Sequence, residues 1–212
     1  MTKDDEAACK RPYSLGKRLE GSDKKRTAVL DAARAQLEAG GYANLTMESL
    51  AQASGVTRQT VHNLFGTKAG VLEALFDRLA VDAGMEQMAV VMRQGEPGAL
   101  LEGFVKVFAG FWNKDRLLIR RIHGIAAIDP EFGAAVEARN QRRRMAASLI
   151  VDRITDGIDA GLKEQRIAAL WAMTSFEFFD AMAESLGDAQ RASDTMLMLV
   201  RGLMAEAPDS CS

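Results

Sequence analysis

Polar side chains gathered between residues 58 and 63 offer the most specific chemistry in this sequence. They are Arg58, Gln59, Thr60, His62 and Asn63. If Thr57 begins a helix, Val61 and Phe65 fall on its inner face and these polar side chains fall on its outer face. Arginine pairs bidentately with guanine, glutamine pairs with adenine, and threonine brings a methyl group to thymine. The pattern favours a helix that reads base edges; the alternative is a solvated polar helix without a ligand.

Lys68 offers a different contact at the start of the next predicted helix. Free backbone N–H groups and a nearby cation together favour a phosphate. The local charge agrees, because residues 1–68 hold 11 Lys or Arg against 8 Asp or Glu, whereas the rest of the chain holds 16 against 21. The chain is therefore acidic overall, with a formal charge of −2, but modestly basic where a DNA contact is expected.

The helices that must position these side chains are marked by signals at their ends. Thr46 can cap the segment MESLAQAS, which ends at Gly55. Thr57 can cap RQTVHNLF, which ends at Gly66. Two short helices that meet at a turn of small residues form a helix-turn-helix.

Helical periodicity continues through the rest of the chain, without a convincing strand pattern. Before the helix-turn-helix, a helix is expected from Ser22 or Asp23 to the Gly40-Gly41 pair, and residues 1–22 are interpreted as a mobile arm. After it, helices are expected over residues 69–94, 98–114, 116–128, 131–161, 162–186 and 188–206. The predicted fold is all-α with roughly nine helices. Its expected parts are a helix-turn-helix domain at 23–69 and a helical regulatory and dimerisation domain at 70–208.

Residues suited to enzyme or metal chemistry are sparse. His62 and His123 are far apart, and neither a nucleophile elbow nor a phosphate-cradling glycine loop occurs. Cys9 and Cys211 lie in polar ends of the sequence and form no metal-ligand set. The sequence therefore predicts neither an enzyme nor a bound cofactor or metal. It also contains no secretory signal and no apolar run long enough to span a membrane, so a cytoplasmic protein is expected.

From Gly41-Tyr42 through residues 45–72, the sequence resembles the TetR-type transcriptional regulators. The matching positions are Thr46, Leu50-Ala51, Ala53, Gly55-Val56, Phe65, Lys68 and Leu72. Beyond this segment the resemblance is one of architecture, a long helical body with an Asp-Pro-Glu corner at residues 129–131.

The resemblance implies a homodimer that binds a near-palindromic operator in double-stranded DNA, with its third helix in the major groove. The residues it places near bases are Arg58, Gln59 and Thr60, and those it places near phosphates are Thr46, Thr57 and Lys68. Lys25, together with Lys24 and Arg26, could add phosphate contacts from the first helix or could simply be solvated. The body would bind a small molecule that relieves repression.

Two positions depart from the family pattern. His62 stands where members usually have a tyrosine whose hydroxyl reaches a phosphate, and Leu64 stands where an aromatic residue or histidine is usual. His62 could donate an N–H instead, and would do so better when protonated. Leu64 cannot contact a phosphate, so it is expected to pack inward or against the fourth helix.

Methionine and aromatic side chains of the body could line an adaptable apolar cavity. They recur at helical spacing as Met85, Met88 and Met92, and as Phe104, Phe108, Phe111 and Trp112. Such stripes more often fill an ordinary core, and a lone histidine is more often a satisfied core residue than a ligand contact. The candidate pocket residues are Met92, Phe108, Trp112 and His123, and the expected effector is a mostly apolar small molecule.

The last two predicted helices are the expected dimer interface. Their stripes are Trp171, Ser175, Phe178, Met182 and Leu186 on one helix, and Met196, Leu199, Val200, Leu203 and Met204 on the other. Two such helices from each subunit can form a four-helix bundle, although either stripe could instead cover the core of its own subunit. The arginine run at 142–144 is interpreted as solvated or paired with Glu137 and Asp152.

These expectations describe a ligand-responsive DNA-binding regulator, and a repressor in the most direct interpretation. The rival is a helical small-molecule carrier or enzyme whose head has lost specific DNA binding. A third alternative is a DNA-binding protein that responds to no ligand. Target genes, operator sequence and effector identity leave no trace in the sequence.

Overall fold

The computed structural model describes residues 15–155 and 157–205, and all regular structure in this part of the chain is helical. The all-α prediction is confirmed, with eleven α-helices where about nine were expected from periodicity. The first four are α1 (Leu15–Glu38), α2 (Met47–Ser54), α3 (Arg58–Phe65) and α4 (Lys68–Asp82). The others are α5 (Met88–Val91), α6 (Pro97–Lys114), α7 (Arg116–Ala126), α8 (Pro130–Ile154), α9 (Ala160–Met173), α10 (Phe176–Leu186) and α11 (Ala189–Ala205). Two short 3₁₀ turns, η1 (Tyr42–Asn44) and η2 (Met85–Gln87), complete the described elements.

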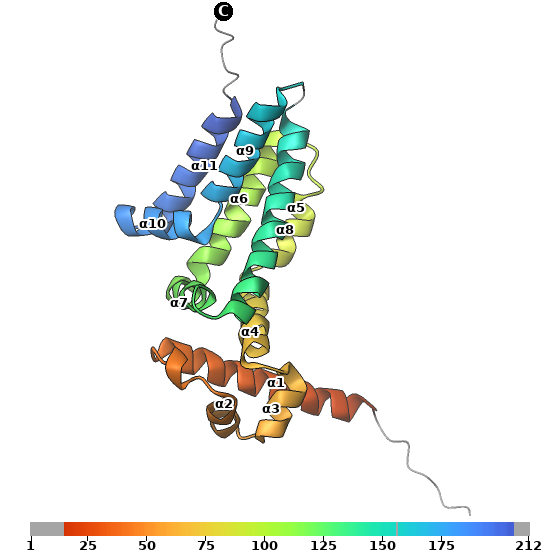
Figure 1. Cartoon of the computed structure of the whole chain (residues 1–212). Helices are drawn as coiled ribbons and strands as arrows, with labels where there is room; N and C mark the ends of the chain where they lie inside the picture. Colours follow the sequence, from red (N-terminus) through yellow and green to blue (C-terminus); the bar gives the residue numbers. More distant parts are fainter. Residues whose placement is uncertain (1–14, 156, 206–212) are drawn as a thin grey trace, which may run out of the picture.

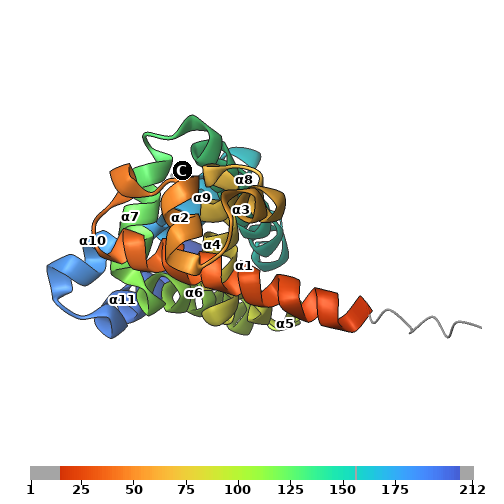
Figure 2. The same cartoon turned by 90° about the horizontal axis from the view of Figure 1, so that it is seen from below.

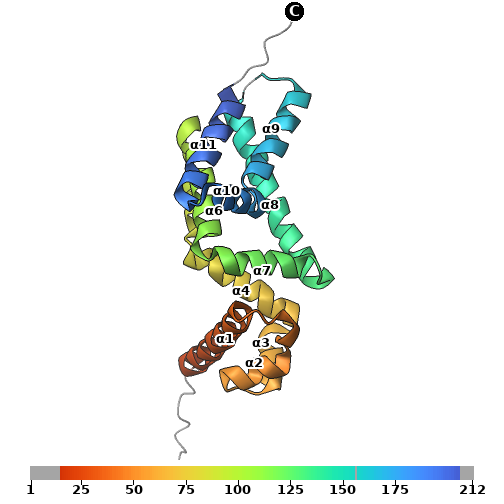
Figure 3. The same cartoon turned by 90° about the vertical axis from the view of Figure 1, so that its left-hand side faces the viewer.

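The molecule is elongated, with a small head at one end and a helical body at the other (Figure 1). Helices α1, α2 and α3 form the head, and α4 leads from it into the body. In the body, α6, α8, α9 and α11 run side by side, as Figures 1 and 3 both show. None of the described helices is both long and apolar enough to cross a membrane.

Threonine caps define the start of each short helix in the head. The Thr46 hydroxyl accepts a hydrogen bond from the Ser49 amide at 3.0 Å, and Ser49 Oγ in turn accepts one from the Thr46 amide. The Thr57 hydroxyl accepts from the Thr60 amide at 3.1 Å. Gly55, with a φ of 67°, turns the chain between the two helices, a conformation that costs glycine nothing. The predicted helix-turn-helix boundaries follow from these local bonds.

Four predicted helices differ from the structure, and one of them, expected over 131–161, ends at Ile154, with the next helix beginning at Ala160. The first helix begins at Leu15 and passes through Ser22 and Asp23, because once a helix has started, adding one residue costs little. Residues 1–14, the remainder of the predicted arm, lie outside the described residues. The single helix predicted over 69–94 is broken at Gly84, which has a φ of 78°. The single helix predicted over 162–186 is divided at Ser175, whose hydroxyl caps α10 by accepting from the Phe178 amide at 3.2 Å.

The head is held together by an apolar core that continues into the body. Val61 on α3 is fully buried, as are Val29, Leu45 and Leu50 in the same core. Phe65 is only partly buried, and the guanidinium of Arg26 lies 4.8 Å from the centre of its ring. Burial of Val61 fixes which face of α3 turns inward, and therefore which side chains remain outside.

Gly70 is required by the close approach of α4 to the end of α3. A Cβ at this position would lie 2.1 Å from the Phe65 carbonyl oxygen. Gly70→Ala should therefore push α3 and α4 apart and lower the free energy of unfolding by about 1–3 kcal/mol, the usual cost of overpacking. Urea unfolding followed by circular dichroism measures this difference.

Gly124→Ala provides the matched control, because Gly124 is also helical and its Cβ would meet no atom within 4 Å. This substitution should leave the protein as stable or up to about 1 kcal/mol more stable. Equal effects of the two substitutions would contradict the steric argument.

Candidate DNA-binding surface and ligand cavity

Helix α3 lies at the outer end of the head, the end that faces the viewer in Figure 2. Arg58, Gln59, His62 and Asn63 are exposed, whereas Thr60 is half-buried. Gln59 donates to Asn63 Oδ1 at 2.8 Å, which holds both amides on the same face. A shallow hollow lies between this face and Met47 of α2, lined also by Arg58, Gln59 and His62. The sequence-predicted base-reading residues therefore share one accessible surface, with Thr60 at its edge.

The surface carries no negative charge of its own. No Asp or Glu occurs between Glu48 and Glu73. Arg58 and His62 form no ion pair within the described part of the chain. An exposed arginine without an acidic neighbour keeps its full attraction for a phosphate or a guanine edge.

The predicted phosphate contacts are arranged around the base-reading face. Thr46 and Thr57 are exposed at the starts of α2 and α3, where their hydroxyl oxygens already accept backbone amides. The hydroxyl groups of Thr57 and Thr60 also lie 2.9 Å apart. A cap threonine can still donate its own proton to a phosphate, because the capping bond uses only a lone pair.

The predicted lysine contacts differ in their surroundings. Lys25 is exposed on α1, one residue before Arg26, which donates to the Leu64 carbonyl at 3.4 Å and is therefore committed to α3. Lys68 is half-buried at the start of α4, with its Nζ 4.0 Å from the centre of the Tyr42 ring. Leu64 itself is half-buried.

A corner between α7 and α8 binds the head to the body. The Tyr42 hydroxyl donates to Asp129 Oδ2 at 2.6 Å, and the Thr67 hydroxyl donates to Glu131 Oε1 at 2.8 Å. The hydrogen bond from Tyr42 is the main reason that the pKa of Asp129 lies below its usual value. Arg121 of α7 donates to the carbonyl groups that end α1, at residues 37 and 38. The Asp-Pro-Glu corner is therefore a contact with the head, a role that sequence reasoning did not assign to it.

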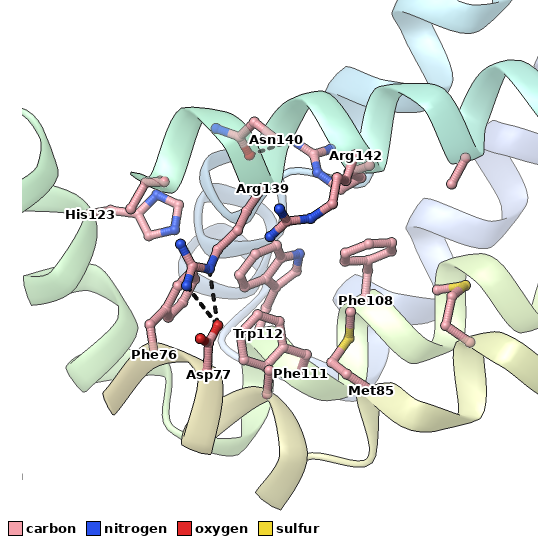
Figure 4. A pocket seen from close by; sticks show the side chains of 15 residues that line it. Phe76, Asp77, Met85, Phe108, Phe111, Trp112, His123, Arg139, Asn140 and Arg142 are labelled. Carbon is pink, nitrogen blue, oxygen red and sulfur yellow. Dashed lines mark hydrogen bonds and ion pairs between the residues drawn. The ribbon is translucent and has the colours of Figure 1, made fainter. Parts of the chain in front are cut away.

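A cavity of about 260 Å³ lies inside the body between α4, α6, η2, α5, α7 and α8 (Figure 4). The apolar and aromatic side chains of its wall are Phe76, Ala80, Met85, Met88, Phe108, Phe111, Trp112, Val136 and Ala146. Its polar wall consists of Asp77, His123, Arg139, Asn140, Arg142 and Arg143. Three of the four predicted pocket residues, Phe108, Trp112 and His123, therefore line one cavity.

Met92 does not line this cavity, so its place among the pocket residues was wrong. Helix α5 ends at Val91, and Met92 instead packs against the core beyond it, with its carbonyl accepting from Arg153. The contributions of Phe76 and Arg143 were missed, because the sequence gives no sign that α4 and α8 face each other. The run 142–144 does not pair with Asp152, which pairs with Lys163, nor with Glu137.

Two polar arrangements stand out in the wall. Arg139 of α8 pairs with Asp77 of α4 at 2.7 Å and joins the two helices across the cavity edge (Figure 4). His123 Nδ1 lies 2.8 Å from Glu177 Oε1, a bond that lowers the pKa of Glu177 to about 2. The His123 ring packs edge-on against Trp112 and beside Phe176, and its Nε2 is buried without a hydrogen-bond partner. His123 is thus only half satisfied by the protein.

Sequence comparison with known proteins matches the head of this chain to a known family. Residues 29–75 match the family described as bacterial regulatory proteins, tetR family. A curated relative, the HTH-type transcriptional regulator AlkX of Mycobacterium tuberculosis, is 31% identical over 107 residues, which is 49% of this chain and 50% of AlkX. The chain therefore aligns with about half the length of this relative.

Solved structures extend the likeness to the whole fold. A TetR transcription regulator from Haloarcula marismortui is 16% identical with a TM-score of 0.61, covering 86% of this chain and 97% of its own. A transcriptional regulator from Rhodococcus sp. Rha1 is 17% identical with a TM-score of 0.61, covering 86% and 95%. Identities this low establish the fold alone. TetR-family regulators are not enzymes, in line with the sequence prediction. The match at residues 29–75 therefore assigns the head of this chain to the tetR family of bacterial regulatory proteins, and the solved structures show that the described fold as a whole is like theirs.

Proposed function

We propose that this protein is a cytoplasmic transcriptional regulator that binds a near-palindromic operator in double-stranded DNA as a homodimer. In the same proposal, a small molecule in the body cavity releases the protein from DNA, so that the protein acts as a repressor. One observation carries the proposal: a capped polar helix, α3, stands free of acidic neighbours at the end of the molecule. The same head is joined through α4 to the wall of a cavity.

Selection of bound DNA fragments distinguishes this proposal from its rival, a helical carrier or enzyme whose head has lost specific DNA binding. Fragments bound from a random pool should converge on a near-palindrome, because a two-fold dimer presents two copies of α3. Affinity for that site should fall steeply with salt as counterions are released from phosphates. Weak binding without sequence preference would instead favour the carrier or enzyme.

Substitution of Arg58 and of Lys68 should change DNA binding in different ways. Arg58→Ala should cost about 1–3 kcal/mol on the selected operator and relax the preference at one base pair, because a bidentate base contact carries sequence information. Lys68→Ala should weaken binding to all sequences alike and lower the salt slope by about 1, because a phosphate contact carries none. Titrations on the operator and on single-base variants separate the two.

Lys106→Ala is the control for these titrations, because Lys106 is exposed on α6 in the body and pairs with Glu102. It should leave DNA affinity unchanged. Uniform weakening by Arg58→Ala on every sequence would make Arg58 a phosphate contact and contradict its assigned role.

His62 should make operator binding depend on pH. An imidazolium donates a stronger hydrogen bond to a phosphate than a neutral ring does, so affinity should rise as the pH falls. His62→Ala should lower the affinity about tenfold under acidic conditions, the worth of one charge-assisted bond, and should flatten the pH profile. His62→Tyr is the informative control, because a phenol keeps a donor but stays uncharged. Unchanged affinity and pH dependence in His62→Ala would refute this role.

The proposed dimer uses α10 and α11, and the structure limits which side chains are free to form it. Met196 and Val200 are fully buried within their own subunit, and their helix α11 contacts α6, α9 and α10. This part of the predicted stripe therefore covers the core, the alternative that the sequence left open. Met198 and Leu199 of α11 remain exposed, by 63% and 37%.

A double substitution tests the dimer face. Met198→Glu with Leu199→Glu should convert the dimer to a monomer, because charges would be buried in an apolar interface. Met145→Glu with Leu149→Glu on α8, whose side chains are comparably exposed, is the control and should leave the dimer intact. Light scattering at micromolar concentration gives the mass. If the wild-type protein is a monomer, the proposed dimer is refuted. If only the α8 substitutions dissociate the dimer, the interface lies on α8 instead of α11.

A further inference from the structure

Arg143 is buried in the cavity wall without a carboxylate partner. The residue is 5% exposed, and its guanidinium donates to the Trp171 carbonyl, to Thr174 Oγ1 at 3.2 Å and to Asn140 Oδ1 at 3.3 Å. All three acceptors are neutral, and within the described ranges no carboxylate reaches ion-pair distance of this guanidinium. Burial of a charge without a counterion is costly. This burial lowers the pKa of Arg143 to about 10, in spite of attraction from more distant carboxylates.

A second guanidinium without a partner belongs to the same wall. Arg142 is exposed, and it makes no hydrogen bond or ion pair with any described residue. Figure 4 places it on the α8 side of the cavity. Arg139 differs, because Asp77 and, at 3.8 Å, Glu73 neutralise it. The wall thus has three arginines against a single acidic side chain, and two of the arginines lack a carboxylate.

The remainder of the wall is apolar and would accept a hydrocarbon or aromatic group. Phe108, Phe111 and Trp112 form an aromatic cluster: the Trp112 ring centre lies 6.0 Å from that of Phe108 and 4.5 Å from that of Phe111. Aromatic walls can also hold cations. A cation would be repelled here by Arg142 and Arg143. The nearby carboxylates are already engaged, because Asp77 is paired with Arg139, and Glu177 outside the wall is bound by His123. The charge of the wall therefore favours an anion.

We infer that this cavity binds a small organic acid, with its apolar body among the aromatic and methionine side chains and its carboxylate at Arg142 and Arg143. A volume of about 260 Å³ lies just below the usual 300–1,000 Å³ of drug-sized pockets, which suits a body of about a dozen non-hydrogen atoms. The inference names the chemical class of the effector in the proposed function and rests on that proposal only for the effect on DNA.

Three probes with the same body and different head groups test the charge. They are 4-phenylbutanoate, 4-phenylbutan-1-ol and 4-phenylbutylamine, added to the full-length dimer or monomer as it exists in solution and measured by calorimetry. The acid should bind about tenfold or more tightly than the alcohol, the gain of one or two charge-assisted hydrogen bonds. The amine should bind most weakly. Binding of the alcohol or amine as tight as that of the acid would overturn the inference, as would no binding by any probe up to its solubility limit.

Single substitutions locate the carboxylate. Arg142→Gln and Arg143→Gln should each weaken the acid about tenfold and leave the alcohol unchanged, because only the acid uses the charge. Arg144→Gln is the matched control, because Arg144 is the next residue on α8 and does not line the cavity. If Arg143→Gln does not fold, the exposed Arg142→Gln decides the question alone. If both variants bind the acid as tightly as the unchanged protein does, the carboxylate does not lie at Arg142 and Arg143.

DNA binding is measured separately with the same probe. Release from the selected operator by 4-phenylbutanoate would join the cavity to regulation. Binding of the acid without any change in operator affinity would leave the inference about the cavity standing and would contradict the effector part of the proposed function.

Discussion

One helix, α4, belongs to both the head and the cavity, and the arrangement of the molecule depends on its placement. Its first residue, Lys68, lies over Tyr42 beside the DNA-binding surface, whereas Phe76 and Asp77 near its other end line the cavity. Most of the residues between are buried, which leaves little freedom for the helix to slide past its neighbours. Because a rigid helix transmits a displacement along its length, we expect a change in the spacing between α4 and α8 at the cavity to move the head in the proposed function.

A second connection fixes the head at another point. Arg121 donates to the last carbonyl groups of α1, and Asp129 and Glu131 accept hydrogen bonds from Tyr42 and Thr67. These bonds come from α7 and the start of α8, the same helices that supply His123 and Arg139 to the cavity wall. The cavity wall therefore contacts the head twice, once through α4 and once through this corner, and the two contacts meet where Lys68 and Asp129 both approach Tyr42.

The parts of the structure that depend on neighbouring residues could be predicted from the sequence. Thr46, Gly55 and Thr57 set the ends of α2 and α3 by bonds within one turn, so the polar face of α3 followed from local signals. The break at Ser175 had such a signal, a serine cap, but the apolar pattern on both sides concealed it. Phe108, Trp112 and His123 could be named as cavity residues from their chemistry, but the contributions of α4 and α8 could not, because they depend on how distant helices pack. Arg142 and Arg143 are adjacent, yet one is exposed and the other buried, since successive helical residues point about 100° apart.

The burial of Arg143 lowers the stability of the folded protein but gives the cavity a preference for an anionic ligand. Other partly buried arginines do have carboxylate partners: Arg34 on α1 pairs with Asp115, and Arg116 on α7 pairs with Asp180. Replacing a buried charge by an apolar residue of similar volume is often stabilising, so packing alone gives no reason for a guanidinium at position 143. Local conflicts with folding rules tend to fall at functional sites, where the cost is offset by what the group binds. Three neutral acceptors hold the guanidinium in place while leaving its charge unneutralised, and that combination is what an anionic ligand needs from a protein: a cation that is already oriented and has no competing partner.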